Sequence, residues 1–187
     1  MILYLHGFAS SSNSHKVKNL RDFPDVPVVS FDLDVDPRVA IKQISSFIKE
    51  HENEDIMLMG SSLGGYYALH IATIFNLPAV LINPSIHPYQ TLSRFVGMPQ
   101  KNYSKDETIV YKKEYIQTLQ SLTIDQVDQS KILLLVQTGD ESLDYRRSVE
   151  ALPHARQHIE EGGNHSFEDF PKTFSLIRDF YKDMFKA

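Results

Sequence analysis

The sequence predicts an α/β fold, with a mostly parallel sheet of about six strands and helices on both of its faces. Five short runs along the chain are almost continuously apolar, which is typical of strands buried on both faces. The segments between these runs carry apolar residues at helical spacing. Strands that alternate with helices in this way form a parallel sheet, because each helix carries the chain back to the end of the sheet where the previous strand began.

The expected strands follow from the apolar runs in chain order. They are Ile2–Leu5, Val26–Phe31, Ile56–Met59, Ala79–Ile82 and Ile132–Val136, and a weaker run, Gln157–Glu160, comes last.

Three helices are indicated most clearly. Asp36-Pro37 is a good N-cap and first-turn pair, and apolar residues recur at helical spacing after it. The segment Leu63–Phe75 is apolar almost throughout, so we expect a central helix that is covered on most sides. Phe170-Pro171 opens the last apolar stripe, which runs to Met184.

The interval 84–130 interrupts the alternation, because no strand is expected within it. Long excursions over a sheet edge are often functional. Two interpretations stay open: extra helices packed on the sheet, or a helical cap over a pocket. The interval also contains scattered aromatic residues and lysines, namely Tyr89, Phe95, Tyr103, Tyr111, Tyr115, Lys101, Lys105, Lys112 and Lys113.

Composition limits the class of protein. A chain of 187 residues with 42% hydrophobic and 23% charged residues suits one domain, 1–187, with a substantial core. The net charge of −5 argues against binding to nucleic acid or to anionic membranes. The absence of cysteine excludes disulfides, cysteine nucleophiles and thiolate metal sites. The opening MILYLHGF has only five apolar residues before His6, too few for a signal peptide or a membrane span. We therefore expect a cytoplasmic enzyme or binding protein.

The stretch GSSLGG, from Gly60 to Gly65, predicts a nucleophile at a sharp strand-to-helix turn. Only Ser62 has glycines two residues before and two residues after it, at Gly60 and Gly64. The turn needs small neighbours because the strand and the helix approach each other too closely for side chains there. Ser61 has Met59 and Leu63 at the same offsets, so we assign the nucleophile to Ser62.

The donors that would stabilise an oxyanion are expected in two places. His6-Gly7-Phe8 ends the first strand, and in such a sheet this loop lies beside the turn. We therefore expect the backbone N–H of Phe8 to be one donor and that of Leu63, which follows the nucleophile, to be the other. His6 is expected to be structural.

The general base should follow the last strand. His165 lies in EGGNHSF, where Gly162 and Gly163 let a loop carry an imidazole over the sheet edge. His154 and His158 flank the preceding strand and are expected at the surface. His165 is therefore the predicted base.

The acid that orients this histidine should leave the end of the fifth strand, in LLLVQTGDESLDY. Asp140 is the preferred residue, with Asp144 as the main alternative and Glu141 behind both. The resulting chain order is Ser62, Asp140, His165.

Two other patterns resemble binding motifs. Asp32, Asp34 and Asp36 resemble the start of a calcium loop, but the glycine and the final glutamate of that loop are missing, so Asp36 is better explained as a helix cap. The serines Ser10–Ser12 and Ser14, with Lys16, have the composition of a phosphate cradle, and a solvated loop leading into a helix is favoured over it.

Taken together, these motifs resemble the small bacterial α/β-hydrolase esterases of the YqiA-like family. The resemblance spans nearly the whole chain and is carried by LHGF at 5–8, GSSLGGYYA at 60–68, INPS at 82–85, QTGDESLDYR at 137–146 and EEGGNHSF at 160–167. It implies a compact α/β-hydrolase fold, with esterase activity on small acyl esters and a triad at Ser62, Asp140 and His165.

The leading hypothesis is a serine esterase that hydrolyses short-chain acyl esters through an acyl-enzyme. Two alternatives stay open: an acyl-CoA thioesterase that uses the same triad, and a hydrolase-fold binding protein without catalysis. None of the three needs a cofactor or a metal. The expected partner is a small acyl ester or thioester, and the oligomeric state is not predicted.

Overall fold

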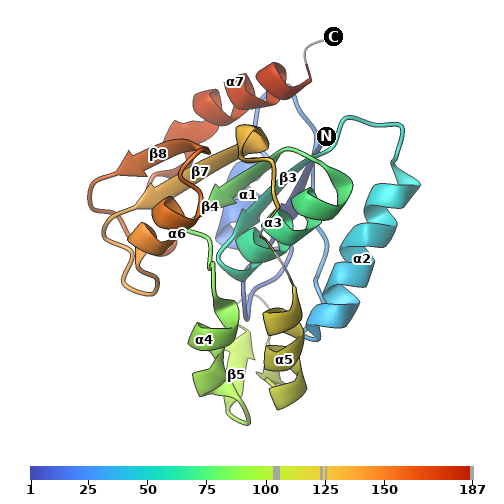
Figure 1. The fold of residues 1–187 in the computed structure, drawn as a ribbon, viewed down its shortest axis with the longest axis vertical. Coiled ribbons are helices and arrows are strands. Elements are labelled where there is room, and N and C mark those ends of the chain that lie inside the picture. Colours follow the sequence, from blue (N-terminus) through green and yellow to red (C-terminus); the bar gives the residue numbers. More distant parts are fainter. Residues whose placement is uncertain (103–105, 123, 125, 186–187) are drawn as a thin grey trace.

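A computed structural model describes residues 1–102, 106–122, 124 and 126–185. Its main sheet has six strands in the order β2-β1-β3-β4-β7-β8, and every neighbouring pair is parallel (Figure 1). This confirms the predicted α/β class and the parallel sheet. The strands are β1 (Ile2–Leu5), β2 (Val28–Val29), β3 (Met57–Ser61), β4 (Ala79–Ile82), β7 (Ile132–Gln137) and β8 (Arg156–Glu160).

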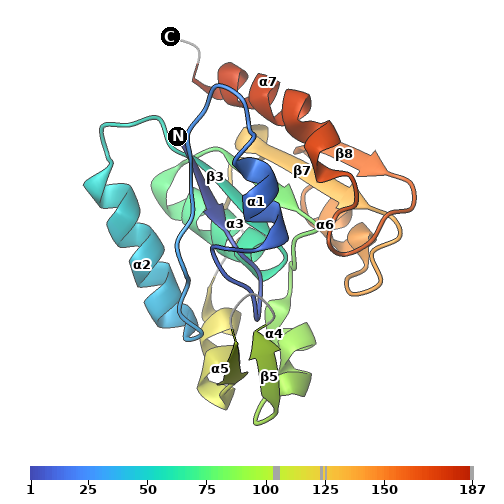
Figure 2. The same cartoon turned by 180° about the vertical axis from the view of Figure 1, so that it is seen from behind.

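Helices cover both faces of this sheet. On one face lie α2 (Pro37–Glu50), α3 (Leu63–Phe75) and α6 (Tyr145–Ala151) (Figure 1). On the other face lie α1 (His15–Leu20) and α7 (Phe174–Met184), which the reverse view brings forward (Figure 2). The short 3₁₀ turn η3 (Phe170–Thr173) precedes α7, so the last helix begins later than the proline suggested.

The strands supply a separate core to each face because successive side chains of a strand point to opposite sides. Leu3 and Leu58 join the core under α2 and α3, whereas Tyr4 and Met57 join the core under α1 and α7. Both faces are therefore buried, and this is why the strands read as continuous apolar runs.

The start of α2 confirms the predicted cap. Asp36 is its N-cap, and its carboxylate accepts a hydrogen bond from the Arg38 backbone N–H. Pro37 occupies the first turn, where its missing N–H costs nothing.

The interval 84–130 differs from the expectation, because it contains strands as well as helices. An antiparallel hairpin of β5 (Pro99–Asn102) and β6 (Glu107–Val110) lies between α4 (Pro88–Leu92), followed by η1 (Ser93–Phe95), and α5 (Lys113–Ser121). The prediction of helices alone was wrong because most of these strand residues are polar or exposed. A third 3₁₀ turn, η2 (Gln129–Lys131), leads into β7. Tyr103 and Lys105 lie outside the described residues.

This α4–α5 segment packs at the carboxyl end of β1. Phe8, just after β1, stacks on Phe95 at 5.6 Å and meets the edge of Tyr111 at 5.2 Å between ring centroids. The Tyr66 hydroxyl on α3 contacts the carbonyl oxygens of Leu119 and Leu122 at 2.8 Å each. Aromatic packing and buried hydrogen bonds therefore hold the segment to the sheet domain.

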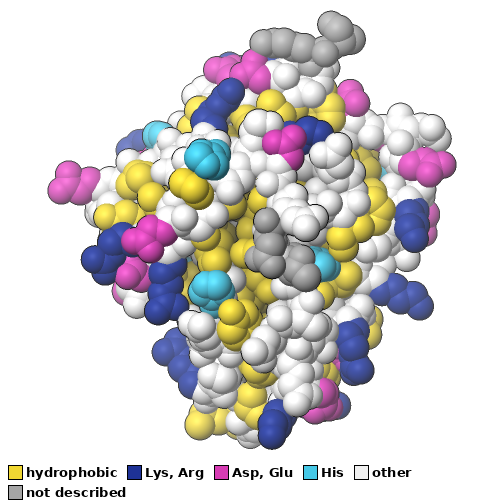
Figure 3. Space-filling view, viewed as in Figure 1, with side chains coloured by type: hydrophobic (Ala, Val, Ile, Leu, Met, Phe, Trp, Pro, Cys, Tyr) yellow, Lys and Arg dark blue, Asp and Glu magenta, His cyan; other side chains and the backbone are white. Residues whose placement is uncertain are grey.

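Charged side chains lie mostly around the rim of the face shown in Figure 3, whereas hydrophobic side chains reach its middle. Across the described residues, no helix has the length and apolar character needed to span a bilayer.

Candidate active site

Ser62 stands at the turn between β3 and α3 in a backbone conformation that is rare for a residue with a side chain. Its φ is 55° and its ψ is −119°. Such a conformation stores about 1–3 kcal/mol of strain, and it persists only where the surrounding structure enforces it. Ser61, by contrast, ends β3 and is 7% exposed.

The two flanking glycines are required by close backbone contacts. A Cβ atom on Gly60 would lie 2.2 Å from the Gly64 carbonyl oxygen, and one on Gly64 would lie 2.0 Å from the Leu5 carbonyl oxygen. No side chain fits at either distance. The glycine frame inferred from the sequence thus has a direct steric cause.

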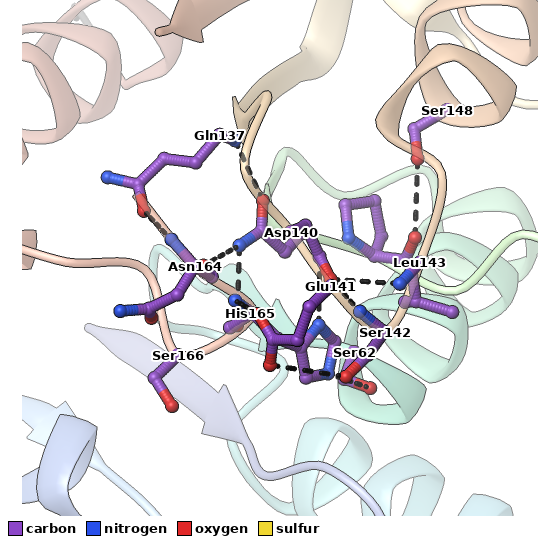
Figure 4. A network of polar contacts seen from close by, with 12 residues as sticks. Ser62, Gln137, Asp140, Glu141, Ser142, Leu143, Ser148, Asn164, His165 and Ser166 are labelled. Carbon is purple, nitrogen blue, oxygen red and sulfur yellow. Dashed lines mark hydrogen bonds and ion pairs between the residues drawn. The ribbon is translucent and has the colours of Figure 1, made fainter. Parts of the chain in front are cut away.

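His165 lies next to Ser62, although 103 positions separate them in the sequence. His165 Nε2 lies 3.1 Å from Ser62 Oγ, and His165 Nδ1 lies 2.8 Å from Asp140 Oδ2 (Figure 4). If Nδ1–H donates to the carboxylate, Nε2 is left to accept the Ser62 hydroxyl proton. The Asp140 side chain is 2% exposed and the His165 side chain 25% exposed, so both are partly or wholly withdrawn from water.

Glu141 and Asp144, the alternatives to Asp140, bond to backbone N–H groups. Glu141 accepts a hydrogen bond from the His165 backbone N–H at 3.0 Å, and this bond lowers the pKa of its carboxyl group. Asp144 caps α6 by accepting from the Arg146 backbone N–H. Of the three carboxylates, Asp140 is the one in contact with the imidazole.

His158 was expected beside the last strand but lies within β8, where its Nε2 is 2.9 Å from Glu160.

Two buried amide side chains hold the histidine loop, and sequence reasoning gave them no role. The Asn83 side-chain amide donates to the carbonyl oxygens of Asn164 and His165 at 3.0 and 3.3 Å, and its oxygen accepts from the Gln137 backbone N–H. The Gln137 side-chain oxygen accepts from the backbone N–H groups of Asn164 and Glu168. Asn83 is 2% exposed and Gln137 is 3% exposed. These contacts fix the loop backbone on both sides of the imidazole, and Figure 4 shows the one between Gln137 and Asn164.

Close backbone packing joins this loop to the one that carries Asp140. The Gly139 N–H donates to the Gly162 carbonyl at 2.7 Å, and a Cβ on Gly139 would lie 2.5 Å from the Gly163 carbonyl oxygen. Gly162 and Gly163 have φ of 77° and 70°, the left-handed region that glycine enters without strain.

The loop after β1 passes directly beside Ser62. A Cβ on Gly7 would lie 3.3 Å from the Ser62 Cβ. Leu63 is the first residue of α3, so its N–H has no acceptor within the helix. Phe8 and Leu63 line one cavity with Ser62, which is where the predicted oxyanion donors are needed.

His6 has contacts that fit the structural role expected of it. Its Nε2 accepts from the Leu33 backbone N–H at 3.0 Å, and its Nδ1 lies 2.9 Å from the Gly7 carbonyl oxygen. The imidazole thereby ties the loop after β1 to the segment before α2.

A cavity of about 220 Å³ opens beside Ser62 and His165 toward the α4–α5 segment. Half of the residues that line it are apolar, among them Phe8, Leu92 and Phe95, and the polar ones include Arg94. Among the described residues, no group of three or more histidine, aspartate or glutamate side chains is arranged to hold a metal ion.

Relatives of known sequence cover almost the whole chain. Residues 1–182 match the uncharacterised protein family UPF0227. The UPF0227 protein YcfP of Salmonella gallinarum is 27% identical over 187 residues, covering 96% of this chain and 98% of its own. The corresponding YcfP of Salmonella arizonae is 28% identical with the same coverage.

Solved structures with the same fold include esterases. Est1E from Butyrivibrio proteoclasticus, bound to ferulic acid, superposes with a TM-score of 0.78 at 13% identity, covering 100% of this chain and 89% of that one. The esterase RhEst1 from Rhodococcus superposes with a TM-score of 0.61 at 16% identity, covering 98% and 90%. Mouse α/β-hydrolase domain-containing protein 10 gives 0.72 at 16% identity, covering 97% and 89%. The chain therefore belongs to the UPF0227 family, as the YqiA-like resemblance indicated, and it has the α/β-hydrolase fold.

Proposed function

We propose that this protein is a serine hydrolase of small carboxylic esters, with Ser62 as nucleophile, His165 as general base and Asp140 as the acid that orients the base. The observation that carries the proposal is the continuous chain of contacts from Ser62 through His165 to a buried Asp140, at 3.1 and 2.8 Å. Both distances are within hydrogen-bond reach, which the general-base mechanism requires.

In the proposed reaction, His165 Nε2 takes the proton of Ser62 as Oγ attacks the ester carbonyl carbon. The oxyanion of the tetrahedral intermediate accepts hydrogen bonds from the backbone N–H groups of Phe8 and Leu63. The C–O bond to the alcohol then breaks, and His165 returns the proton to the leaving oxygen. Water, deprotonated by the same imidazole, hydrolyses the acyl-enzyme.

The size of the cavity beside Phe95 supports a small acyl group. Its volume of about 220 Å³ lies below the roughly 300–1,000 Å³ typical of sites that enclose drug-sized ligands. Esterases among the solved structures of the same fold also support ester chemistry. Hydrolysis of an acyl-CoA thioester would depend on the same three residues, and the same variants test it.

Hydrolysis of p-nitrophenyl butyrate by the wild type, Ser62→Ala and Ser61→Ala tests the proposal. We expect Ser62→Ala to abolish turnover and Ser61→Ala to keep most of it, because His165 Nε2 contacts the Ser62 hydroxyl. Wild-type levels of turnover in Ser62→Ala, or no turnover in the wild type on any short ester or thioester, would refute it.

A further inference from the structure

Ser62 and His165 also border a second cavity, on the side of the molecule where α1 lies. It has a volume of about 560 Å³ and is lined by residues of the loop after β1 and of α1. Its polar lining comes from Ser10, Ser14, His15, Lys16 and Ser166. An ester bound at Ser62 therefore has two cavities beside it, one toward Phe95 and Arg94 and the other toward Lys16.

Lys16 supplies the positive charge of the second cavity. Its ammonium donates to the carbonyl oxygen of Ser166, the residue that follows His165. An ammonium has three N–H donors, so further donors are available to a ligand. Among the ion pairs found in the described part of the chain, none involves Lys16.

The surroundings of the Lys16 ammonium lower its affinity for a proton. Burial lowers its pKa to about 8, and the charge of Asp140 opposes this shift. The other titratable groups that border the cavity are Tyr4 on β1, His15 on α1 and His165. The turn η3 also packs on α1, and its one charged residue, Lys172, is exposed and pairs with Asp169.

Part of the serine cluster noted in the sequence faces this cavity and part does not. The Ser12 backbone N–H and hydroxyl both donate to Asp32, so they are not arranged around a phosphate. The Ser14 hydroxyl borders the cavity, is buried, and has no hydrogen-bond partner within the described residues. A buried hydroxyl without a partner is costly, and an anionic oxygen in the cavity would satisfy it.

We propose that this protein prefers esters whose alcohol part carries a carboxylate or phosphate, with the acyl group in the cavity beside Phe95 and the anionic alcohol part held by Lys16 and Ser14. The inference rests on the proposed esterase function and adds the class of leaving group to it. The charge of Lys16 would offset the desolvation of the anion, since a charge-assisted hydrogen bond is about twice as strong as a neutral one. The reaction is ordinary hydrolysis: the anionic alcohol departs with the proton from His165, and water supplies the second oxygen of the acid.

A matched pair of substrates tests this inference. The butyryl ester of 4-hydroxybenzoate carries a carboxylate on the leaving group, and the butyryl ester of methyl 4-hydroxybenzoate has that charge blocked. The two phenols differ in intrinsic reactivity, so the ratio of their kcat/KM values is compared between variants and not taken alone. A third ester with a phosphate in place of the carboxylate shows which of the two anions is preferred.

Lys16→Met should reduce the ratio of anionic to neutral ester by about tenfold, the usual effect of losing one hydrogen bond to a charged group. Lys16→Arg, which keeps the charge, should retain most of the ratio. The exposed Lys18 on the same helix provides the control, and Lys18→Met should leave the ratio unchanged.

The possible results separate this inference from the function on which it rests. Hydrolysis of both esters with the same ratio in wild type and Lys16→Met would overturn the anionic preference and leave the esterase standing. An equal fall in the ratio in Lys16→Met and Lys18→Met would also overturn the anionic preference. The combined charge of the surface, and not a contact in the cavity, would then explain the effect. If the wild type hydrolysed neither of these esters nor any other short ester or thioester, the esterase function and this inference would be refuted together.

Discussion

Replacement of Asp140 by asparagine is expected to disable the proposed base while leaving its surroundings in place. Asp140 Oδ1 accepts from the backbone N–H groups of Ser142 and Leu143 at 2.8 Å each, whereas Oδ2 faces His165 Nδ1 at 2.8 Å. The two backbone donors fix the orientation of an asparagine at this position, because only its oxygen can accept from them. Its NH₂ group must then face the imidazole.

That orientation reverses the hydrogen bond to the histidine. The NH₂ group donates to Nδ1, so the proton of the neutral imidazole moves to Nε2, the nitrogen that faces Ser62. A base in this tautomer cannot take the serine proton. From a comparable substitution in other serine hydrolases we expect kcat to fall by about 10³- to 10⁴-fold. This loss corresponds to about 4 to 5.5 kcal/mol of barrier.

Asp144→Asn is the matched control. Asp144 caps α6 and pairs with Arg146 at 2.8 Å, with side chains 40% and 70% exposed. Asparagine caps helices as well as aspartate does, and an exposed ion pair contributes about 0–1 kcal/mol. Turnover of p-nitrophenyl butyrate should therefore change by less than about threefold. Comparable losses in both variants, or a loss in Asp144→Asn alone, would refute the reasoning, with thermal unfolding checking that each variant is folded.

Three further predictions concern the glycines around Ser62, the cavity beside Phe95 and the second cavity. Gly64→Ala should fail to fold or lose several kcal/mol of stability by thermal unfolding, because its Cβ would meet the Leu5 carbonyl at 2.0 Å, whereas Gly7→Ala, with contacts at 3.3 Å, should lose much less. For p-nitrophenyl esters, kcat/KM should peak at acyl chains of about two to six carbons, since each buried CH₂ adds about 0.8 kcal/mol only while the cavity has room; a rise through sixteen carbons for esters and for acyl-CoAs would contradict this. The anionic ester preference should decline as pH rises through about 8, since the raised pH removes the proton of Lys16, and a flat ratio from pH 7 to 9.5 would count against Lys16 as the anion ligand.

Much of the fold could be predicted because buried elements carry strong patterns. The bounds of β1, β4 and α3 agree with the expected ones. The second strand was expected over Val26–Phe31, yet only Val28–Val29 pairs with β1, because an apolar pattern does not say how far an edge strand stays in register. The hairpin β5–β6 was missed since its mostly polar, exposed residues lack the pattern of a buried strand.

The residues with proposed chemical roles could be chosen from motif context and chain order. Ser62 has its glycine frame, and His165 and Asp140 each follow a strand at the expected edge. The residues that hold the histidine loop could not be chosen in this way. Asn83 reaches Asn164 and His165 across 81 and 82 residues, and Gln137 reaches Glu168 across 31. Such contacts depend on how the sheet brings distant loops together, and no local pattern records them.

The central claim is that Ser62 is a nucleophile activated by His165. The most direct measurement is covalent labelling with a fluorophosphonate, followed by peptide mass spectrometry to locate the adduct. We predict one adduct per chain, on Ser62, lost in Ser62→Ala and strongly slowed in His165→Ala. An adduct on Ser61 or elsewhere, or no labelling of the folded wild type, would contradict the claim.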